Sequence, residues 1–157
     1  MSGSYRCRMT SKPLTRRSQH SSRVTDRSVR LLLDTHIFIW ALGEPHKLPS
    51  VARSAIENSA NEVFVSAAVA WEISIKHALG KLPLPMAPAS YVPSRLLQLR
   101  FKELSITFAH TLALSGLPTH HADPFDRILI AQAQIEGLTL VSVDSEIAKY
   151  PVPMLAV

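Results

Sequence analysis

Short, apolar segments recur along the chain and are separated by segments with a helical pattern. Leu31–Leu33, Val63–Val65 and Leu138–Val143 are the clearest, and each is followed within a residue or two by a polar side chain and then by a predicted helix or turn. Strands that are apolar on both faces and alternate with helices are typical of a parallel sheet covered on both sides. The sequence therefore predicts an α/β fold.

Capping and breaking residues set the bounds of the other elements. Ser66 and Asp123 are placed to begin helices, Gly80 and Gly137 to end them, and the prolines of Leu82–Pro88 predict a loop. The predicted helices are Thr35–Leu42, Ser50–Ala60, Ala67–Leu79, Ala89–Phe101, Phe108–Ser115, Asp123–Glu136 and Ser145–Lys149, with further strands at Glu103–Ile106 and Met154–Val157.

Composition excludes several classes of protein. The chain has 157 residues, of which 46% are hydrophobic and 18% charged, a balance typical of one packed domain rather than a disordered chain. No apolar run reaches the roughly 20 residues that a membrane-spanning helix needs. The single cysteine, Cys7, cannot form an internal disulfide, which fits a reducing compartment. We expect a cytoplasmic protein with no membrane partner.

The positive charge is confined to the first residues. Residues 1–30 contain eight Lys and Arg against one Asp, a balance of +7, whereas residues 31–157 contain nine basic and eleven acidic residues, a balance of −2. We expect residues 1–28 to be a disordered basic tail and residues 29–157 to be the folded domain. A nucleic-acid-binding arm or an organellar transit peptide are alternatives. We favour an upstream extension from a misassigned start codon, with Met9 or a later codon as the start.

Acidic residues follow the predicted strands. Asp34 and Asp144 come directly after apolar strands, and ligands of open α/β sheets bind beyond such carboxyl ends. Glu72 lies in the second turn of the helix after the second strand, and Asp126 in the first turn of the helix before the last long strand. All four carboxylates can therefore converge at one edge.

A cluster of carboxylates needs a counter-charge, because otherwise at least one of them takes up a proton. Oxygen ligands of this kind suit Mg²⁺ or Mn²⁺ far better than zinc, and both ions also bind phosphate oxygens. The cluster therefore points to phosphodiester chemistry. Each acid also has a structural explanation: Asp34 as a helix cap, Glu72 in a salt bridge, and Asp144 in a turn or as a cap.

Taken together, four segments resemble the PIN-domain family, and more narrowly the VapC-like toxin ribonucleases of type II VapBC toxin–antitoxin modules. The resemblance covers residues 29–157 in order and with compatible spacings. Its segments are Leu31–His36, Val65–Ile73, His121–Ala133 and Leu140–Asp144.

The resemblance implies a three-layer α/β/α sandwich with a central parallel sheet of about five strands. It implies an Mg²⁺- or Mn²⁺-dependent endoribonuclease that leaves a 5′-phosphate and a 3′-hydroxyl. It also implies a small cognate antitoxin and operator DNA bound only through the antitoxin complex. The catalytic and metal-binding residues that it implies are Asp34, Glu72, Asp126 and Asp144. We further expect a homodimer, because apolar faces on the predicted helices Ala67–Leu79 and Ala89–Phe101 could serve a dimer or an antitoxin groove.

In the mechanism that we expect, Asp34 and Asp126 hold the main metal ion, and Glu72 and Asp144 complete its shell directly or through water. Thr35 and Ser142 place hydroxyls beside the site, Ser142 standing where many family members have Thr. The family pattern leaves the role of Asp123 open, and its position also suits a helix N-cap.

Other residues near these motifs have competing interpretations. Arg127 is expected to contact either RNA phosphate or a nearby acid. His120 and His121 are less expected as metal ligands than as loop side chains. Trp71 and Trp40, at apolar helical positions, are interpreted as core or interface anchors, and His36 as structural.

Three other functions compete with the toxin ribonuclease. A haloacid-dehalogenase-like phosphatase would need a second Asp two residues after Asp34, where this chain has His36. A degenerate PIN domain acting only as a binding module would be expected to lack one of the acids. A DNA nuclease, or a PIN protein of RNA processing with no antitoxin, stays open.

Overall fold

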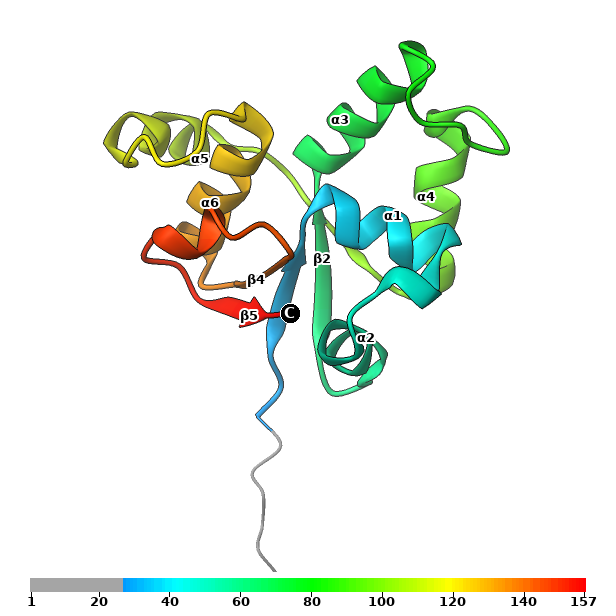
Figure 1. Cartoon of the computed structure of the whole chain (residues 1–157), viewed down its shortest axis with the longest axis horizontal. Helices are drawn as coiled ribbons and strands as arrows, with labels where there is room; N and C mark the ends of the chain where they lie inside the picture. Colours follow the sequence, from blue (N-terminus) through cyan, green and yellow to red (C-terminus); the bar gives the residue numbers. More distant parts are fainter. Residues whose placement is uncertain (1–26) are drawn as a thin grey trace, which may run out of the picture.

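The computed structural model of the chain describes residues 27–157 (Figure 1). The disordered basic tail was predicted for residues 1–28, and of these the structure describes only residues 27 and 28. The rest of that prediction lies outside the described residues. Within the described part, no helix combines the length and the apolar character that crossing a bilayer requires.

The core is a five-stranded sheet in which every pair of neighbours is parallel. The strand order is β3-β2-β1-β4-β5. The strands are β1 (Arg30–Leu33), β2 (Glu62–Ser66), β3 (Lys102–Leu104), β4 (Thr139–Ser142) and β5 (Met154–Ala156). The predicted fold class and strand number are confirmed.

Helices cover both faces of the sheet (Figure 1). One face carries α1 (Thr35–Gly43), α2 (Ser50–Glu57), α3 (Ala67–Ala78) and α4 (Pro88–Leu99), and the other carries α5 (Phe108–Ala113) and α6 (Pro124–Glu136). The connections from β1 to β2 and from β2 to β3 cross the sheet in one direction, and the connection from β3 to β4 crosses it in the opposite direction. Because crossovers between parallel strands are right-handed, the helices of the first two connections lie on one face and those of the third lie on the other. The result is the expected three-layer sandwich.

Strand β1 lies at the centre of the sheet, with the side chains of Leu31, Leu32 and Leu33 fully buried. The chain passes from α6, on one face of the sheet, into the neighbouring strand β4. From β1 it passes into α1, on the other face. The ends of β1 and β4 therefore form the crevice where the strand order reverses, the place where open α/β sheets bind ligands. The two predicted acids Asp34 and Asp144 follow these two strands.

Two predicted helices are shorter in the structure because side chains compete for their backbone groups. The predicted helix Ser50–Ala60 ends at Glu57, where Asn58 Oδ1 accepts the N–H of Ala60 at 3.0 Å. The predicted helix Ser145–Lys149 is reduced to a single 3₁₀ turn, Ile147–Lys149, preceded by a turn on Asp144. Asn and Asp make such local turns readily.

Two more 3₁₀ turns occur, Pro45–Lys47 and Leu114–Gly116; the first was not predicted and the second completes the predicted helix Phe108–Ser115. Helix α6 ends as predicted, because Gly137 adopts φ +64°, a conformation that glycine accepts without strain. The chain then enters β4 directly.

Candidate active site

Asp34 ends β1 and begins α1. Its Oδ1 accepts the N–H of Ile37 at 2.7 Å, so the structural interpretation as a helix cap is realised. The nearby Ser142 hydroxyl lowers the pKa of the same carboxyl. Burial nevertheless raises the pKa of Asp34, and the charge of Glu72 adds to the rise. The cap is thus also a buried carboxylate that a cation would stabilise.

Ser142, the last residue of β4, joins Asp34 to Asp144. It is fully buried, and its Oγ accepts the backbone N–H of Asp144 at 3.0 Å. The same hydroxyl lowers the pKa of Asp34, so Ser142 lies next to both acids. The expected place of Ser142 beside the site is what the structure shows.

Asp126 lies in the first turn of α6, three residues after the N-cap Asp123. The Asp123 side chain accepts the N–H of Phe125 at 2.8 Å, so the predicted cap is confirmed. Burial, together with the charges of Asp123, Asp34 and Glu72, raises the pKa of Asp126 to about 7, against the opposing effect of His121. Asp126 therefore lies in a field of other carboxylates.

Asp144 follows β4 and is the most exposed of the four acids. Its Oδ1 accepts the N–H of Glu146 at 2.8 Å, which is the predicted turn. Its Oδ2 accepts a hydrogen bond from His121 Nε2 at 2.8 Å. This hydrogen bond is the largest cause of the lowered pKa of Asp144.

His121 bridges two of the acids. Its Nε2 lies 2.8 Å from Asp144 Oδ2 and 3.2 Å from Asp126 Oδ2. Its Nδ1 accepts the backbone N–H of Asp123 at 3.0 Å, so the neutral ring carries its proton on Nε2. Burial lowers the pKa of His121, but the bond to Asp144 and the acidic charges around it outweigh burial and raise it. In this arrangement His121 Nε2 donates to Asp144, and His121 also lies close enough to Asp126 and Asp144 for the three to share an ion.

Glu72 is held from two sides. Its Oε2 accepts a hydrogen bond from the Thr35 hydroxyl, and its Oε1 lies 2.6 Å from Lys76 Nζ one turn further along α3. The salt bridge that the sequence allowed is therefore present. Glu72 still faces the other acids, because its charge raises the pKa of both Asp34 and Asp126.

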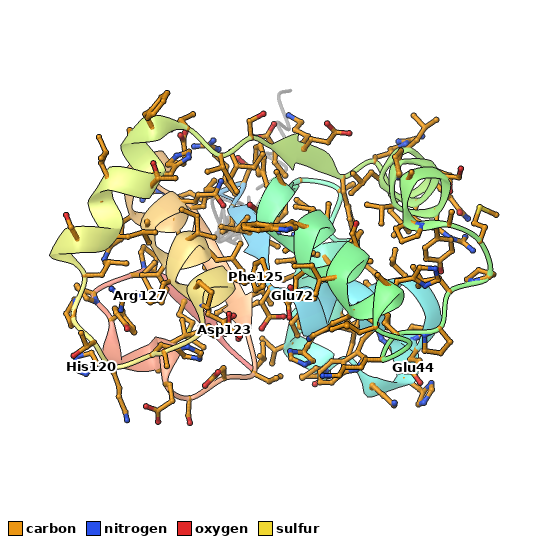
Figure 2. All side chains as sticks on the ribbon, turned by 90° about the horizontal axis from the view of Figure 1, so that it is seen from above. Glu44, Glu72, His120, Asp123, Phe125 and Arg127 are labelled. Carbon is orange, nitrogen blue, oxygen red and sulfur yellow. The ribbon has the colours of Figure 1, made fainter. Side chains whose placement is uncertain are left out.

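The acids meet at one edge of the sheet, with different degrees of contact. Donor atoms of His121, Asp126 and Asp144 all lie within 4.8 Å of one another, a group to which Asp34 and Glu72 do not belong. Figure 2 looks onto this edge and shows Glu72, Asp123 and Phe125 near its centre, with Glu44 and His120 at opposite ends. The predicted convergence is thus tight for Asp126 and Asp144 and looser for the other two.

The donor set fits a hard divalent cation. All four acids offer carboxylate oxygens, the ligands that such ions prefer. Burial, and then the charges of neighbouring acids, raise the pKa of Asp126 to about 7, so the charged form of this carboxyl is only partly compensated. A cation among the acids would compensate it.

Within residues 27–157, Arg127 forms no salt bridge with an acid, which was one of the two contacts expected of it. Its guanidinium donates to the main-chain carbonyls of the segment between α5 and α6 and lies 3.3 Å from the Tyr150 hydroxyl. The accepting carbonyls are those of Leu114, Leu117, Pro118 and His121, at 2.6–3.4 Å. Backbone carbonyls in an irregular segment need donors, and a fork of five N–H groups supplies several at once. Arg127 thus fixes the loop that carries His121.

Trp71 is not a core residue, since 60% of it is exposed. Its ring packs edge-on against Phe125 with centroids 5.1 Å apart, bridging α3 and α6. His120, the other loop histidine, is exposed and packs against Tyr150. His36 is exposed beside Trp40, and its charge lowers the pKa of Asp34 and Asp144.

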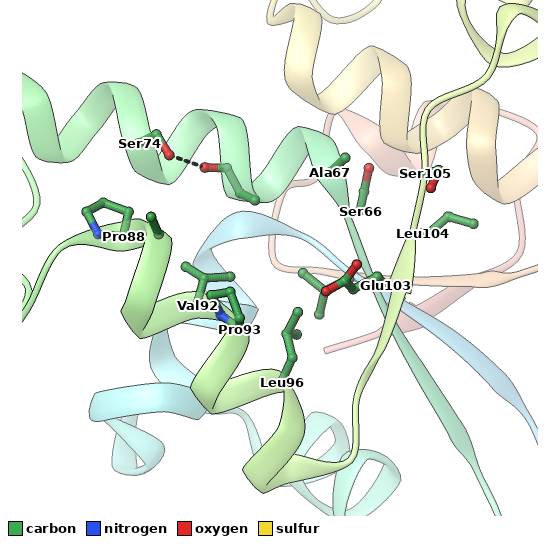
Figure 3. Close-up of a pocket in the computed structure, with 13 residues that line it drawn as sticks. Ser66, Ala67, Ser74, Pro88, Val92, Pro93, Leu96, Glu103, Leu104 and Ser105 are labelled. Atoms are coloured by element: carbon green, nitrogen blue, oxygen red, sulfur yellow. Dashed lines mark hydrogen bonds between the residues drawn. The ribbon is translucent and has the colours of Figure 1, made fainter.

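A separate cavity of about 290 Å³ opens between α3, α4 and β3 (Figure 3). Apolar side chains such as Val92 and Leu96 line it, with Glu103 as its one acid. None of the four clustered carboxylates lines it.

Sequence comparison finds relatives with ribonuclease names. Ribonuclease VapC16 of Mycobacterium tuberculosis is 39% identical over 89 residues, which span 51% of this chain and 63% of that protein. The match therefore covers less than two thirds of that relative. Ribonuclease VapC22 of the same organism is 28% identical over 124 residues, spanning 78% of this chain and 93% of that protein.

Two solved structures share the fold. They are VapBC2 from Rickettsia felis bound to a DNA fragment from its promoter (TM-score 0.61, 17% identity) and VapBC-1 from nontypeable Haemophilus influenzae (TM-score 0.54, 16% identity). Each match covers 82% of this chain and 98% of the other. The family model for the PIN domain matches residues 31–153, which include all four clustered acids. The chain therefore belongs to the PIN domain family.

Proposed function

We propose that this protein is an Mg²⁺- or Mn²⁺-dependent endoribonuclease that acts as the toxin of a toxin–antitoxin pair. The observation that carries the proposal is the convergence of acids at the carboxyl edge of the sheet, where carboxylate oxygens of Asp126 and Asp144 lie within 4.8 Å of each other and the charges of Asp34 and Glu72 act on Asp126. The ribonuclease names of two relatives support RNA as the substrate.

Each acid has a role in this proposal. Asp34 and Asp126 hold the ion, and Asp144 and Glu72 complete its surroundings directly or through water. When bound, the ion supplies an attacking water of lowered pKa and polarises the scissile phosphate. Ser142 orients Asp34 and Asp144, and Thr35 orients Glu72, so the chain itself sets the positions of the oxygen ligands. The products are a 5′-phosphate and a 3′-hydroxyl.

The proposed antitoxin is a small protein that covers this edge and joins the operator DNA as part of the complex. The fold neighbours are named as VapBC complexes, one of them with promoter DNA. The cavity between α3 and α4 offers an apolar groove for a segment of such a partner (Figure 3).

We also propose a homodimer. Trp71, Ile75 and Leu79 are exposed at spacings of four residues along α3, which places them in one apolar stripe. Phe108 and Leu112 form a second exposed pair on α5. Light scattering on the purified protein gives the mass that tests this.

Cleavage of a single-stranded RNA by the purified protein tests the activity. We expect cleavage with Mg²⁺ or Mn²⁺, none with a chelator, and none of a DNA of the same sequence. Asp34→Asn, purified identically, is the control for contaminating ribonucleases. Cleavage that persists in the chelator, or in Asp34→Asn, contradicts the proposal.

A further inference from the structure

Lys76, on α3, is a basic side chain that contacts one of the four clustered acids, Glu72. Its Nζ lies 2.6 Å from Glu72 Oε1, and the side chains of Lys76 and Glu72 are 33% and 11% exposed. Most ion pairs between residues four apart on a helix are exposed to water and contribute little to stability. This pair is partly buried, so its two charges act on each other through a less polarisable medium.

Both carboxylate oxygens of Glu72 are occupied in the structure. Lys76 contacts Oε1, and the Thr35 hydroxyl donates to Oε2. Glu72 also stands outside the group of donor atoms that His121, Asp126 and Asp144 form. A metal ion could therefore coordinate Glu72 directly only by displacing one of these two contacts.

The charges around Glu72 disfavour such a displacement. The Lys76 ammonium already balances the negative charge of Glu72. The same ammonium would repel a divalent cation placed at this carboxylate. By contrast, no Lys or Arg among residues 27–157 forms a salt bridge with Asp126, whose basic neighbour is His121, with Nε2 3.2 Å from Asp126 Oδ2. The charge of Glu72 is therefore already paired with an ammonium, whereas that of Asp126 is not.

On the basis of the metal-dependent function proposed above, we propose that Lys76 is a positioning residue that takes the place of a second metal ion at Glu72. It holds the Glu72 carboxylate off the metal, so that the protein without RNA binds one divalent ion. Glu72 then acts on that ion through water.

Mn²⁺ titration of the full-length protein, followed by electron paramagnetic resonance or calorimetry without RNA, tests this inference. Wild type is expected to bind one ion. Lys76→Met frees a partly buried carboxylate and is expected to bind a second ion at least about tenfold tighter than any second ion in wild type. Lys76→Arg keeps the positive charge and is expected to bind one ion.

Two further variants separate this role from loss of stability. Glu72→Gln combined with Lys76→Met removes the exposed ligand and is expected to return the count to one. Lys47→Met breaks the pair with Glu44, at 2.8 Å and well exposed, and is expected to leave the count unchanged. Thermal unfolding shows that each variant is folded.

The outcomes distinguish this inference from the function on which it rests. Two ions in wild type, or one ion with unchanged affinity in Lys76→Met, overturns the role of Lys76 and leaves the nuclease proposal standing. Absence of any Mn²⁺ binding by folded wild type overturns the metal-dependent function, and the role of Lys76 with it.

Discussion

Asp126→Asn should stabilise the protein when no metal is present. In the structure, Asp126 is partly buried and lies near Asp123, Asp34 and Glu72; burial, and then these charges, raise its pKa from 3.8 to about 7. Above pH 7 the folded chain must keep this carboxylate charged in a partly buried place among like charges. Asparagine has nearly the same shape but carries no charge.

The size of the effect follows from the pKa. Moving a carboxyl pKa from 3.8 to about 7 corresponds to roughly 4 kcal/mol against the charged form. The carboxylate is partly exposed, so water screening lowers this, and we expect about 2 kcal/mol. Between about pH 4 and 7 the unfolded chain releases this proton while the folded chain keeps it. Wild type therefore loses stability as the pH rises through that window.

Urea unfolding in a chelator at pH 4.5 and at pH 8 measures the difference. The variant should be more stable than wild type by about 2 kcal/mol at pH 8 and by clearly less at pH 4.5, where the folded wild type keeps more of the Asp126 proton. Added Mn²⁺ should then stabilise wild type and leave the variant nearly unchanged, because ligand binding stabilises only the chain that binds it.

Glu57→Gln is the matched control, since Glu57 is an exposed acid at the end of α2, away from the acid cluster (Figure 1). It should give no such pH-dependent gain. If Asp126→Asn is less stable than wild type at pH 8 in the chelator, Asp126 is not held among uncompensated charges, and the electrostatic reasoning for the site is wrong.

Three more predictions follow from the same geometry. Asp123→Asn should keep the α6 cap and most of the activity, whereas Asp123→Ala should lower the unfolding free energy by about 1 kcal/mol; inactive but stable Asp123→Asn would place Asp123 among the metal ligands. Asp34→Asn should keep the α1 cap and reduce metal-dependent cleavage at least ~100-fold, and full activity in a kinetic assay would remove Asp34 from the metal site. Mn²⁺ affinity should weaken about tenfold per pH unit below pH 7, because the ion competes with the Asp126 proton; calorimetry showing the same affinity at pH 5.5 and 7.5 would contradict this.

The sheet and the placement of the acids could be predicted because they depend on local pattern. Apolar strands, capping residues and the rule for carboxyl ends placed Asp34 and Asp144 at neighbouring strand ends, as the structure shows. The N-cap at Asp123 was predicted from Asp-Pro alone.

The bridging histidine could not be predicted in the same way. His121 reaches Asp144, 23 residues away, because the loop before α6 folds back over the end of β4. Nothing in the spacing signals that return, and only the adjacent Asp123 and Asp126 hinted at His121. The spacing of four residues between Glu72 and Lys76 predicts their ion pair. The strength of that pair depends on how far it is buried, which the sequence alone does not give. The sequence left open whether Trp71 lies in the core or at an interface, because apolar helical spacing does not separate the two, and the structure exposes it.

The Arg127 contacts have a consequence for how strongly this edge can bind. Ordering a loop residue removes about 1–2 kcal/mol of conformational entropy. Because Arg127 holds the carbonyls of Leu117, Pro118 and His121 in the free protein, this loss belongs to folding and is not subtracted from the affinity for a ligand. The loop that carries His121 is therefore held in place before any ligand binds. A chain that made the same contacts with its ligand, but ordered this loop only when the ligand binds, would bind that ligand more weakly.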